Sequence, residues 1–282
     1  MRTTLVPNCL ALLTVLAPAG RCSDTTAEES EMGTLEIEVV PLDDLSITIV
    51  YDNTAYHQGL RADWGFACVI EGLEKKILFD TGADGDLLLM NIDKLACHPR
   101  DMETVVLSHE HWDHVDGLDE FLTMNPGVEV FLLESFPEEI QRTVAGSGAA
   151  SVEVTGPVEI CTGIYSTGPM GSDPEEQSLV IATDHGAVVI TGCAHPGITG
   201  IVRRAIELTG QDILLVMGGF HLRSHRDEQV QQIIGEFRDL GVVYAGPCHC
   251  TGDRQIEIIS EAFQEQFIRI GVGRVVTAAD LP

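Results

Sequence analysis

Four potential metal ligands in one short segment constrain this chain more than any other feature of its sequence. His109, His111, Asp113 and His114 fall within six residues, directly after the apolar run of residues 104–107. In a tight loop at the end of a buried strand, such side chains can converge on one small volume. Imidazole and carboxylate groups suit zinc, manganese and iron, whereas clustering them without a metal would desolvate polar groups at a net cost. The segment therefore predicts a metal-binding loop at a strand end.

Short strand-like runs and helical periodicities follow one another from residue 35 onward. In the first half, strands are expected at residues 35–40, 46–51, 65–70, 76–79, 104–107 and 128–133, and helices at 84–97 and 117–124. In the second half, strands are expected at residues 152–154, 158–165, 179–183, 187–191, 213–217, 242–245 and 274–276, and helices at 198–208, 227–240 and 256–267. Two halves of this kind predict an α/β fold with two sheets packed face to face and helices outside.

Residues 1–33 are expected to be a signal peptide followed by an acidic linker. A short apolar run at residues 10–17 ends in small residues at 17–19, which resemble a cleavage site. We therefore expect a catalytic domain at residues 34–282 and export to the periplasm or the exterior. If the segment is not a signal, the protein would be cytoplasmic. Cys22 leaves a lipid anchor open, and no other membrane association is expected.

The net charge of −28 limits the partners that this chain can bind. A surface of this sign repels the phosphates of nucleic acids, so no nucleic-acid partner is expected. Metal ions would reverse the sign of the field locally, so a small anionic substrate stays compatible with the composition. The six cysteines after residue 34 are not spaced like a disulfide framework, and three lie beside histidines, which favours a place near a metal. The sequence sets no particular oligomeric state.

The His-x-His-x-Asp-His order after an apolar strand resembles the signature of the metallo-β-lactamase superfamily. Asp80, within residues 78–82, resembles the first motif of that family, whose aspartate usually steadies the metal loop from behind. The resemblance extends in order and spacing over residues 35–282. It implies the four-layer αββα sandwich of this family and a site for two divalent metal ions.

Three later motifs resemble one subgroup of the family. They lie at residues 191–197, 218–222 and 247–252. The subgroup includes the 7,8-dihydropterin-6-ylmethyl-4-(β-D-ribofuranosyl)aminobenzene 5′-phosphate synthase of methanopterin biosynthesis, while most of its members are described only as metal-dependent hydrolases. The resemblance therefore implies either a hydrolase or a transferase of this synthase type.

The sequence departs from the wider family at two ligand positions. Residues 167–173 lack the ligand histidine that most members carry there, and Cys193 replaces a bridging aspartate. Residues two apart in an extended segment face the same way, so Cys193 and His195 can reach the site together. The expected ligand sets are therefore His109, His111 and His195 for the first metal ion, and Asp113, His114 and His249 for the second.

Cys193 leaves two interpretations open. A thiolate that bridges the two ions would favour zinc, whereas an inert cysteine would leave manganese or iron equally suitable. Cys248 and Cys250 flank His249 in the sequence. If His249 faces the metal, these two cysteines are expected to face away from it.

Further groups near the metals are expected to act on the substrate. His221 follows a Gly-Gly pair that allows close backbone approach, and it either faces the substrate as a catalytic residue or serves as an extra ligand. Arg223 and Arg226 are candidates for holding a phosphate, because arginine binds it through two donors. Asp113 is expected to orient the attacking water or accept its proton, besides binding metal.

Three functions are compatible with these residues. The first is a metal-dependent hydrolase that uses a dinuclear site and metal-activated water on a small anionic, phosphoester-like substrate. The second is the synthase-type transferase, in which the metals would hold a diphosphate; the expected export argues against it, because its substrate is intracellular. The third is a non-catalytic metal- or redox-binding module built on Cys193.

Overall fold

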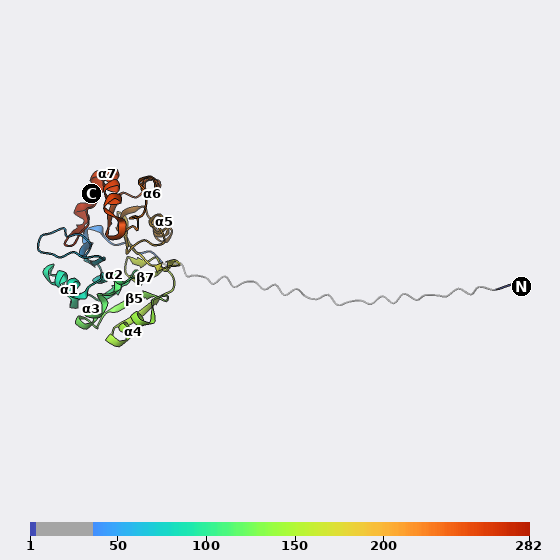
Figure 1. Ribbon diagram of the computed structural model, residues 1–282, viewed down its shortest axis with the longest axis horizontal. Helices are drawn as coiled ribbons and strands as arrows, with labels where there is room; N and C mark the ends of the chain where they lie inside the picture. The colour runs from blue at the N-terminus through green and yellow to red at the C-terminus, as the bar shows by residue number, and fades with distance from the viewer. Residues whose placement is uncertain (4–35) are drawn as a thin grey trace. The chain divides into compact units, whose positions relative to one another are not determined.

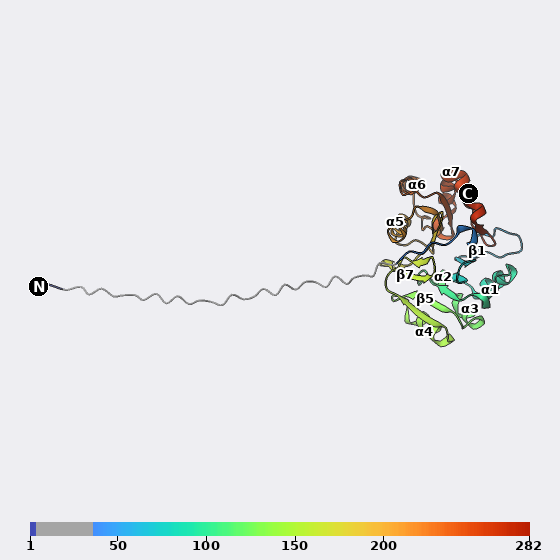
Figure 2. The same cartoon turned by 180° about the vertical axis from the view of Figure 1, so that it is seen from behind.

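The computed structural model describes residues 1–3 and 36–282, so residues 4–33 of the predicted signal peptide and linker lie outside the described residues. From residue 36 onward, two large β-sheets lie between two groups of helices (Figures 1 and 2). Within the described residues, no helix combines the length and apolar character that crossing a membrane requires.

The first sheet has seven strands in the order β15-β1-β2-β3-β4-β5-β6. The strands are β1 (Ser46–Tyr51), β2 (Ala67–Glu71), β3 (Ile77–Phe79), β4 (Thr104–Val106), β5 (Glu129–Leu133), β6 (Ala150–Val154) and β15 (Val275–Thr277). Pairing is antiparallel from β15 to β3 and parallel from β3 to β6. The central strands are buried along almost their whole length, as expected for a sheet covered on both faces.

The second sheet has six strands in the order β14-β13-β12-β11-β8-β7. They are β7 (Val158–Cys161), β8 (Ile164–Ser166), β11 (Leu179–Thr183), β12 (Gly186–Thr191), β13 (Ile213–Gly219) and β14 (Tyr244–Cys248). Strands β12, β13 and β14 run parallel, and the others pair antiparallel. A separate two-stranded ribbon joins β9 (Met170–Gly171) to β10 (Glu175–Glu176).

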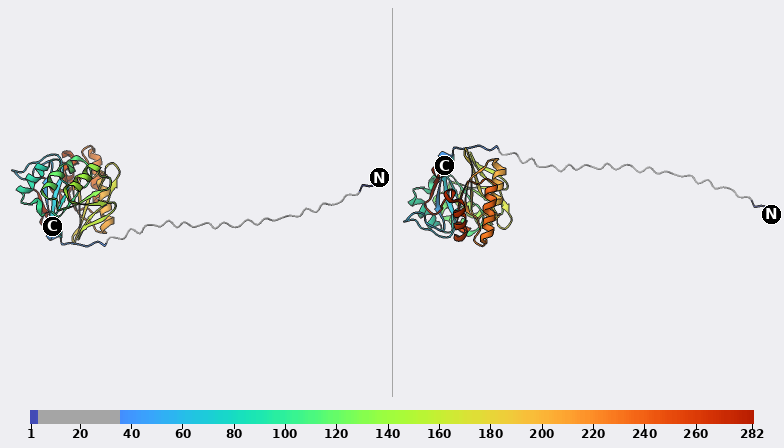
Figure 3. Two further views of the ribbon diagram at one scale, coloured as in Figure 1. Left: turned by 90° about the horizontal axis from the view of Figure 1, so that it is seen from below. Right: turned by 90° about the horizontal axis from the view of Figure 1, so that it is seen from above.

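Helices cover the outer face of each sheet. The helices on the first sheet are α1 (Gly85–Lys94), α3 (Leu118–Met124) and α4 (Glu138–Ser147); those on the second are α5 (Ile198–Thr209), α6 (Asp227–Asp239) and α7 (Asp253–Phe263). Figure 3 shows the two helical groups on opposite sides of the sheets. In β12, Val188 and Ile190 pack into the core between the sheets, while Val189 packs with α5 to α7. This alternation confirms the predicted αββα sandwich.

Two details of the predicted elements are wrong. Residues 36–39 form no strand, and Val40 makes only a single bridge to Thr183 before a 3-10 turn at Leu42–Asp44. Helix α4 is absent from the predicted elements; it packs on the core through buried Val144 and partly buried Ile140. Its N-terminal Pro137 and left-handed Gly148 are ordinary helix boundaries.

The ends of parallel strands from both sheets meet at one edge of the sandwich. In the first sheet, Asp80 follows β3 and the histidine segment follows β4, leading into the short helix α2 (Trp112–Val115). In the second sheet, the loops after β12, β13 and β14 carry His195, His221 and His249. The tertiary fold therefore brings five short loops, distant in sequence, to one place.

Candidate metal centre

Asp80 is the anchor of the histidine segment. Its carboxylate accepts hydrogen bonds from the Ser108 backbone N–H and hydroxyl, both at 2.7 Å, and it lies 2.7 Å from His114 Nδ1. All three residues are fully buried. Burial alone would lower the pKa of His114, but the Asp80 carboxylate outweighs it and raises that pKa. The His114 Nδ1 atom therefore carries the proton, which leaves Nε2 free to bind a metal.

The Asp80 carboxylate also fixes the tautomer of His109, through the hydroxyl of Ser108. The Ser108 hydroxyl donates to Asp80, so it accepts from His109 Nδ1, which lies 2.9 Å away. His109 Nε2 is then left with a lone pair, and it has no hydrogen-bond partner among the described residues. Burial and the neighbouring histidines lower the pKa of His109, so its imidazole is neutral. A neutral imidazole with a buried, unpartnered nitrogen is the form that binds a metal ion.

Asn53 sets the tautomer of His249 in a similar way. The Asn53 amide nitrogen donates to the His249 carbonyl oxygen, and its Oδ1 accepts from Gly65 N–H, so Oδ1 is the acceptor for His249 Nδ1 at 3.0 Å. The His249 backbone N–H is held by buried Asp52 at 3.1 Å. His249 Nε2 thus faces His114 Nε2 at 3.2 Å. Two facing lone pairs repel each other unless a cation lies between them.

Four donor atoms surround the point between His114 Nε2 and His249 Nε2, and these two nitrogens are among the four. Asp113 Oδ2 is 3.2 Å from His249 Nε2 and 3.9 Å from His114 Nε2, and Cys193 Sγ is 3.3 Å from His114 Nε2. Ligand atoms around a tetrahedral zinc ion lie about 3.3–3.8 Å apart. A proton could satisfy only one pair of these atoms, so the donor set fits a metal ion. The His249 and His114 imidazoles outweigh burial and hold the pKa of Asp113 below its usual range, so the carboxylate is ionised.

A second group of donors lies beside the first. The rings of His109, His111 and His195 form a near-equilateral triangle, with centroids 4.7, 4.8 and 4.7 Å apart. His195 Nε2 also has no partner among the described residues, and burial lowers the pKa of His195 to about 4. The structure thus brings the residues assigned to both metals into one cluster, in which the rings of His109 and His114 lie 4.2 Å apart and Cys193 is close to ligands of both sets.

Glu176 supports this centre, although no sequence pattern predicts it. Its buried carboxylate accepts the backbone N–H groups of Cys193, Ala194 and His195 at 2.9, 2.8 and 2.8 Å. Burial raises the pKa of Glu176 to about 7, while those three donors act in the opposite direction. The carboxylate therefore holds the whole loop that presents Cys193 and His195.

Backbone strain is concentrated at the same place. Asp80, Ala194, His221 and His249 all have positive φ, between 49° and 60°, although none is glycine. Such conformations are unfavourable for ordinary residues and persist only where surrounding contacts hold them. Each of the four lies in a loop at the end of a strand that borders the centre, so the strain marks the functional edge of the sandwich.

The predicted orientation of Cys250 is wrong. The expectation rested on an extended chain, but His249–Thr251 is a 3-10 turn, in which neighbouring side chains do not alternate between opposite faces. Cys250 consequently lies with Cys193 and His221 at the centre. Burial opposes ionisation of Cys250, but hydrogen bonds with Cys193 and His221 lower its pKa. Cys248 does face away from the centre, towards Asp52.

Trp64 is a second residue that the sequence pattern does not predict, because it lies 49 residues before its partner. Its indole N–H donates to Asp113 Oδ2 at 2.7 Å, and its ring lies 5.1 Å from the His249 ring. The Arg223 guanidinium lies over the same indole, 5.3 Å from the ring centre. Trp64 therefore orients Asp113 on one side and positions Arg223 on the other. Arg226, the other candidate phosphate ligand, is instead the N-cap residue of α6.

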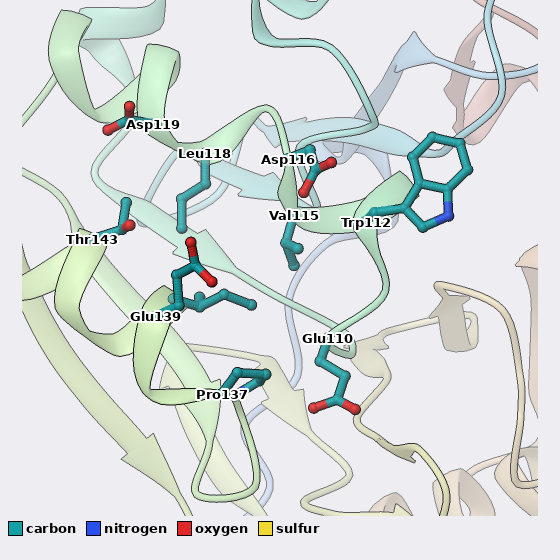
Figure 4. A pocket seen from close by; sticks show the side chains of 10 residues that line it. Glu110, Trp112, Val115, Asp116, Leu118, Asp119, Pro137, Glu139 and Thr143 are labelled. Atoms are coloured by element: carbon teal, nitrogen blue, oxygen red, sulfur yellow. The ribbon is translucent and has the colours of Figure 1, made fainter.

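Two hollows differ in charge, and of these two only the first has residues of the centre in its lining. One, of about 290 Å³, is lined by Trp64, His221, Arg223, Ser224 and Cys250. The other lies between the histidine segment and α4 (Figure 4), and its lining includes the carboxylates of Glu110, Asp116, Asp119 and Glu139. The first hollow therefore offers a positive group beside the metal ligands, whereas the second offers several negative groups.

Comparison with known proteins identifies the family. Residues 65–249, more than half of the chain, match the metallo-β-lactamase superfamily. The chain therefore belongs to this superfamily, as its sequence motifs predict. Members of this superfamily typically bind metals, and they include metal-dependent hydrolases.

Individual relatives agree with this assignment. The 7,8-dihydropterin-6-methyl-4-(β-D-ribofuranosyl)-aminobenzene-5′-phosphate synthase of Methanocaldococcus jannaschii is 26% identical, covering 81% of this chain and 95% of its own. A crystal structure of a metal-dependent hydrolase of the β-lactamase superfamily is 28% identical, with a TM-score of 0.70, covering 82% of this chain and 98% of the other. The metallo-β-lactamase fold protein YhfI of Bacillus subtilis is 13% identical, with a TM-score of 0.63 over 83% of this chain and all of the other, and shares the fold. Membership and the named synthase support an enzymatic function.

Proposed function

We propose that this protein is a metal-dependent hydrolase that binds two divalent ions and uses water to cleave a small anionic, phosphoester-like substrate. The main support is the pair of donor groups, His109, His111 and His195 on one side of Cys193 and Asp113, His114 and His249 on the other. The cysteine among these donors favours zinc over manganese or iron. The net charge of −28 favours a small molecule over a nucleic acid as the substrate.

The residues around the centre would have different roles in the reaction. Ions bound there would supply Lewis acidity, which lowers the pKa of water and stabilises negative charge on the reacting group. Asp113 would orient the attacking water, because its ionised carboxylate faces the centre. The 2.7 Å hydrogen bond from Trp64 fixes the direction of that carboxylate. Asp80 and Asn53 accept hydrogen bonds from the Nδ1 atoms of His114 and His249, so that the Nε2 atoms of both rings face the centre.

The charges of the two hollows support a binding place for the anionic substrate near Arg223. The carboxylates in Figure 4 repel an anion, while Arg223 in the other hollow attracts it. The indole of Trp64 holds the guanidinium of Arg223 in place, so the guanidinium can offer two parallel donors to a phosphate. The phosphate-like end of the substrate would therefore lie between Arg223 and the metal ligands.

Replacement of Arg223 by alanine should raise KM for a phosphoester by about 10–100-fold, because one charge-assisted interaction with the substrate is lost. Steady-state kinetics on the phosphoester found to be cleaved fastest would measure this. Arg226→Ala is the matched control, since Arg226 caps α6 and does not line the hollow. Equal KM values for the two variants would show that Arg223 does not bind the substrate.

The proposal as a whole is tested by metal content and turnover together. Elemental analysis of the purified chain should find at least two divalent ions, and removing them with a chelator should abolish hydrolysis until metal is added back. Phosphodiesters, phosphomonoesters, lactones and lactams form the substrate panel. A fully metallated protein that cleaves none of them would refute a hydrolase and would favour the non-catalytic module.

The synthase-type transferase is the second candidate, supported by the 26% identical relative from Methanocaldococcus jannaschii. The two candidates differ in where the protein works. We propose export, and a mature N-terminus near residue 20 in the periplasm or the medium would disfavour the synthase. Formation of an aminobenzene ribofuranosyl phosphate by the full chain, without hydrolysis of the panel, would favour it.

A further inference from the structure

Cys193, His221 and Cys250 form a third group of potential ligands, which shares Cys193 with the donors of the two predicted metal ions. Their ligand atoms all lie within 4.8 Å of one another. The three residues come from the loops after β12, β13 and β14, whose parallel ends are neighbours in the second sheet. Both cysteines are buried and neither is in a disulfide, while His221 is exposed.

The backbone around this group allows the three loops that carry it to approach one another closely. A side chain at Gly219 would place its Cβ 2.4 Å from the Gly192 carbonyl oxygen and 2.7 Å from Cys250 Sγ. Only glycine there lets the three loops meet. His221 then adopts a left-handed conformation with φ of 53°, and Cys250 lies in a 3-10 turn. Neither conformation is the default for its residue, so the fold holds both side chains at this point.

The donor chemistry of the group differs from that of its neighbours. Two sulfur atoms and one imidazole suit thiophilic ions such as zinc, cobalt and cadmium, whereas manganese prefers oxygen and nitrogen. Three protein ligands leave a fourth position open. That position would face the hollow lined by Trp64, His221, Arg223, Ser224 and Cys250, so an ion there would be accessible to small molecules.

We propose that Cys193, His221 and Cys250 form a third cation site, selective for a thiophilic divalent ion, with the Cys193 thiolate shared with the adjacent histidine and aspartate ligands. Binding would release the two thiol protons to solvent and form two sulfur–metal bonds and one nitrogen–metal bond. This site is additional to the proposed hydrolase centre. Because two thiol protons leave as the divalent ion binds, the net charge of the hollow beside Arg223 would stay unchanged.

Cadmium and manganese binding to the full chain distinguish this site from the other two. Metal-free wild type should bind one more Cd²⁺ per chain than the Cys250→Ser variant, and its sulfur-to-cadmium absorption should fall by about half in the variant, since one of two thiolates is lost. Mn²⁺ stoichiometry should be the same in both proteins. Cys248→Ser is the matched control, because this neighbouring buried cysteine faces Asp52, and it should behave as wild type.

Two further measurements keep the test independent of folding and of turnover. His221→Ala should lose the same Cd²⁺ equivalent as Cys250→Ser, and in crystals of wild type grown with Cd²⁺ the anomalous density should show an ion between all three side chains. Equal Cd²⁺ stoichiometry in wild type and Cys250→Ser, or no ion at this place, would overturn the third site. Both results concern binding alone, so a failure of hydrolysis would count only against the proposed function.

Discussion

Glu176→Ala should destabilise the protein by about 3–5 kcal/mol and release metal from the centre. The substitution leaves the buried N–H groups of Cys193, Ala194 and His195 without an acceptor, and each unmade buried hydrogen bond costs about 1–3 kcal/mol. The loop would then no longer hold Cys193 and His195 in place. Urea denaturation and elemental analysis on the same preparation would measure both effects.

Two matched variants separate this role from a general effect of charge. Glu175→Ala removes the neighbouring, half-buried carboxylate, for which the structure records no hydrogen bond to the loop, and should behave nearly as wild type. Glu176→Gln keeps one carbonyl oxygen as an acceptor but turns an NH2 group towards a backbone donor. Its stability and its metal content should therefore lie between those of Glu176→Ala and those of wild type. If Glu176→Ala kept both wild-type stability and full metal content, the carboxylate would not be what holds the loop.

His111→Ala should remove metal and activity together while leaving the fold stable. His111 lies in the triangle with His109 and His195, and the structure records no hydrogen bond for its side chain. Activity should fall by more than about 100-fold, the upper end of what is lost when a partner only orients a ligand. The free energy of unfolding of the metal-free chain should change by less than about 1 kcal/mol. Metal content, kinetics and urea denaturation would test these three expectations.

His185→Ala is the control for the loss of an imidazole. His185 is exposed at the turn between β11 and β12, paired only with Asp184, so its removal should change neither metal content nor turnover. Stoichiometric metal in His111→Ala would contradict the proposed ligand set. It would mean that His109, His195 and Cys193 suffice for the first ion, as their close grouping allows.

Asp80 shows why a short motif could be interpreted before the structure. Its partners Ser108 and His114 lie in a motif that is contiguous in sequence, and the motif follows a strand that pairs directly with β3. Strand β4, the loop and its ligands are thus contiguous in sequence, whereas Asp80 lies 28 residues before Ser108 and was interpreted from its resemblance to the first motif of the superfamily. The αββα layers could also be predicted from the sequence, because strand and helix patterns are local and their order restricts how sheets can pack.

Other site residues depend on contacts that no local pattern carries. Glu176 lies 17 to 19 residues from the N–H groups it accepts, and Trp64 lies 49 residues from Asp113. Cys250 was placed wrongly because the alternation rule for extended chains does not apply in a 3-10 turn.

The amino-acid sequence by itself determined the layered fold, the histidine segment and the residues available as ligands, since each follows from the order of nearby side chains. Only the tertiary structure decided which carboxylate holds the loop of Cys193, and that Cys250 joins Cys193 and His221. The physical reason is that donor atoms must lie within a few ångströms of one another to share an ion. Only the packing of the two sheets brings the ends of β4, β12, β13 and β14 that close.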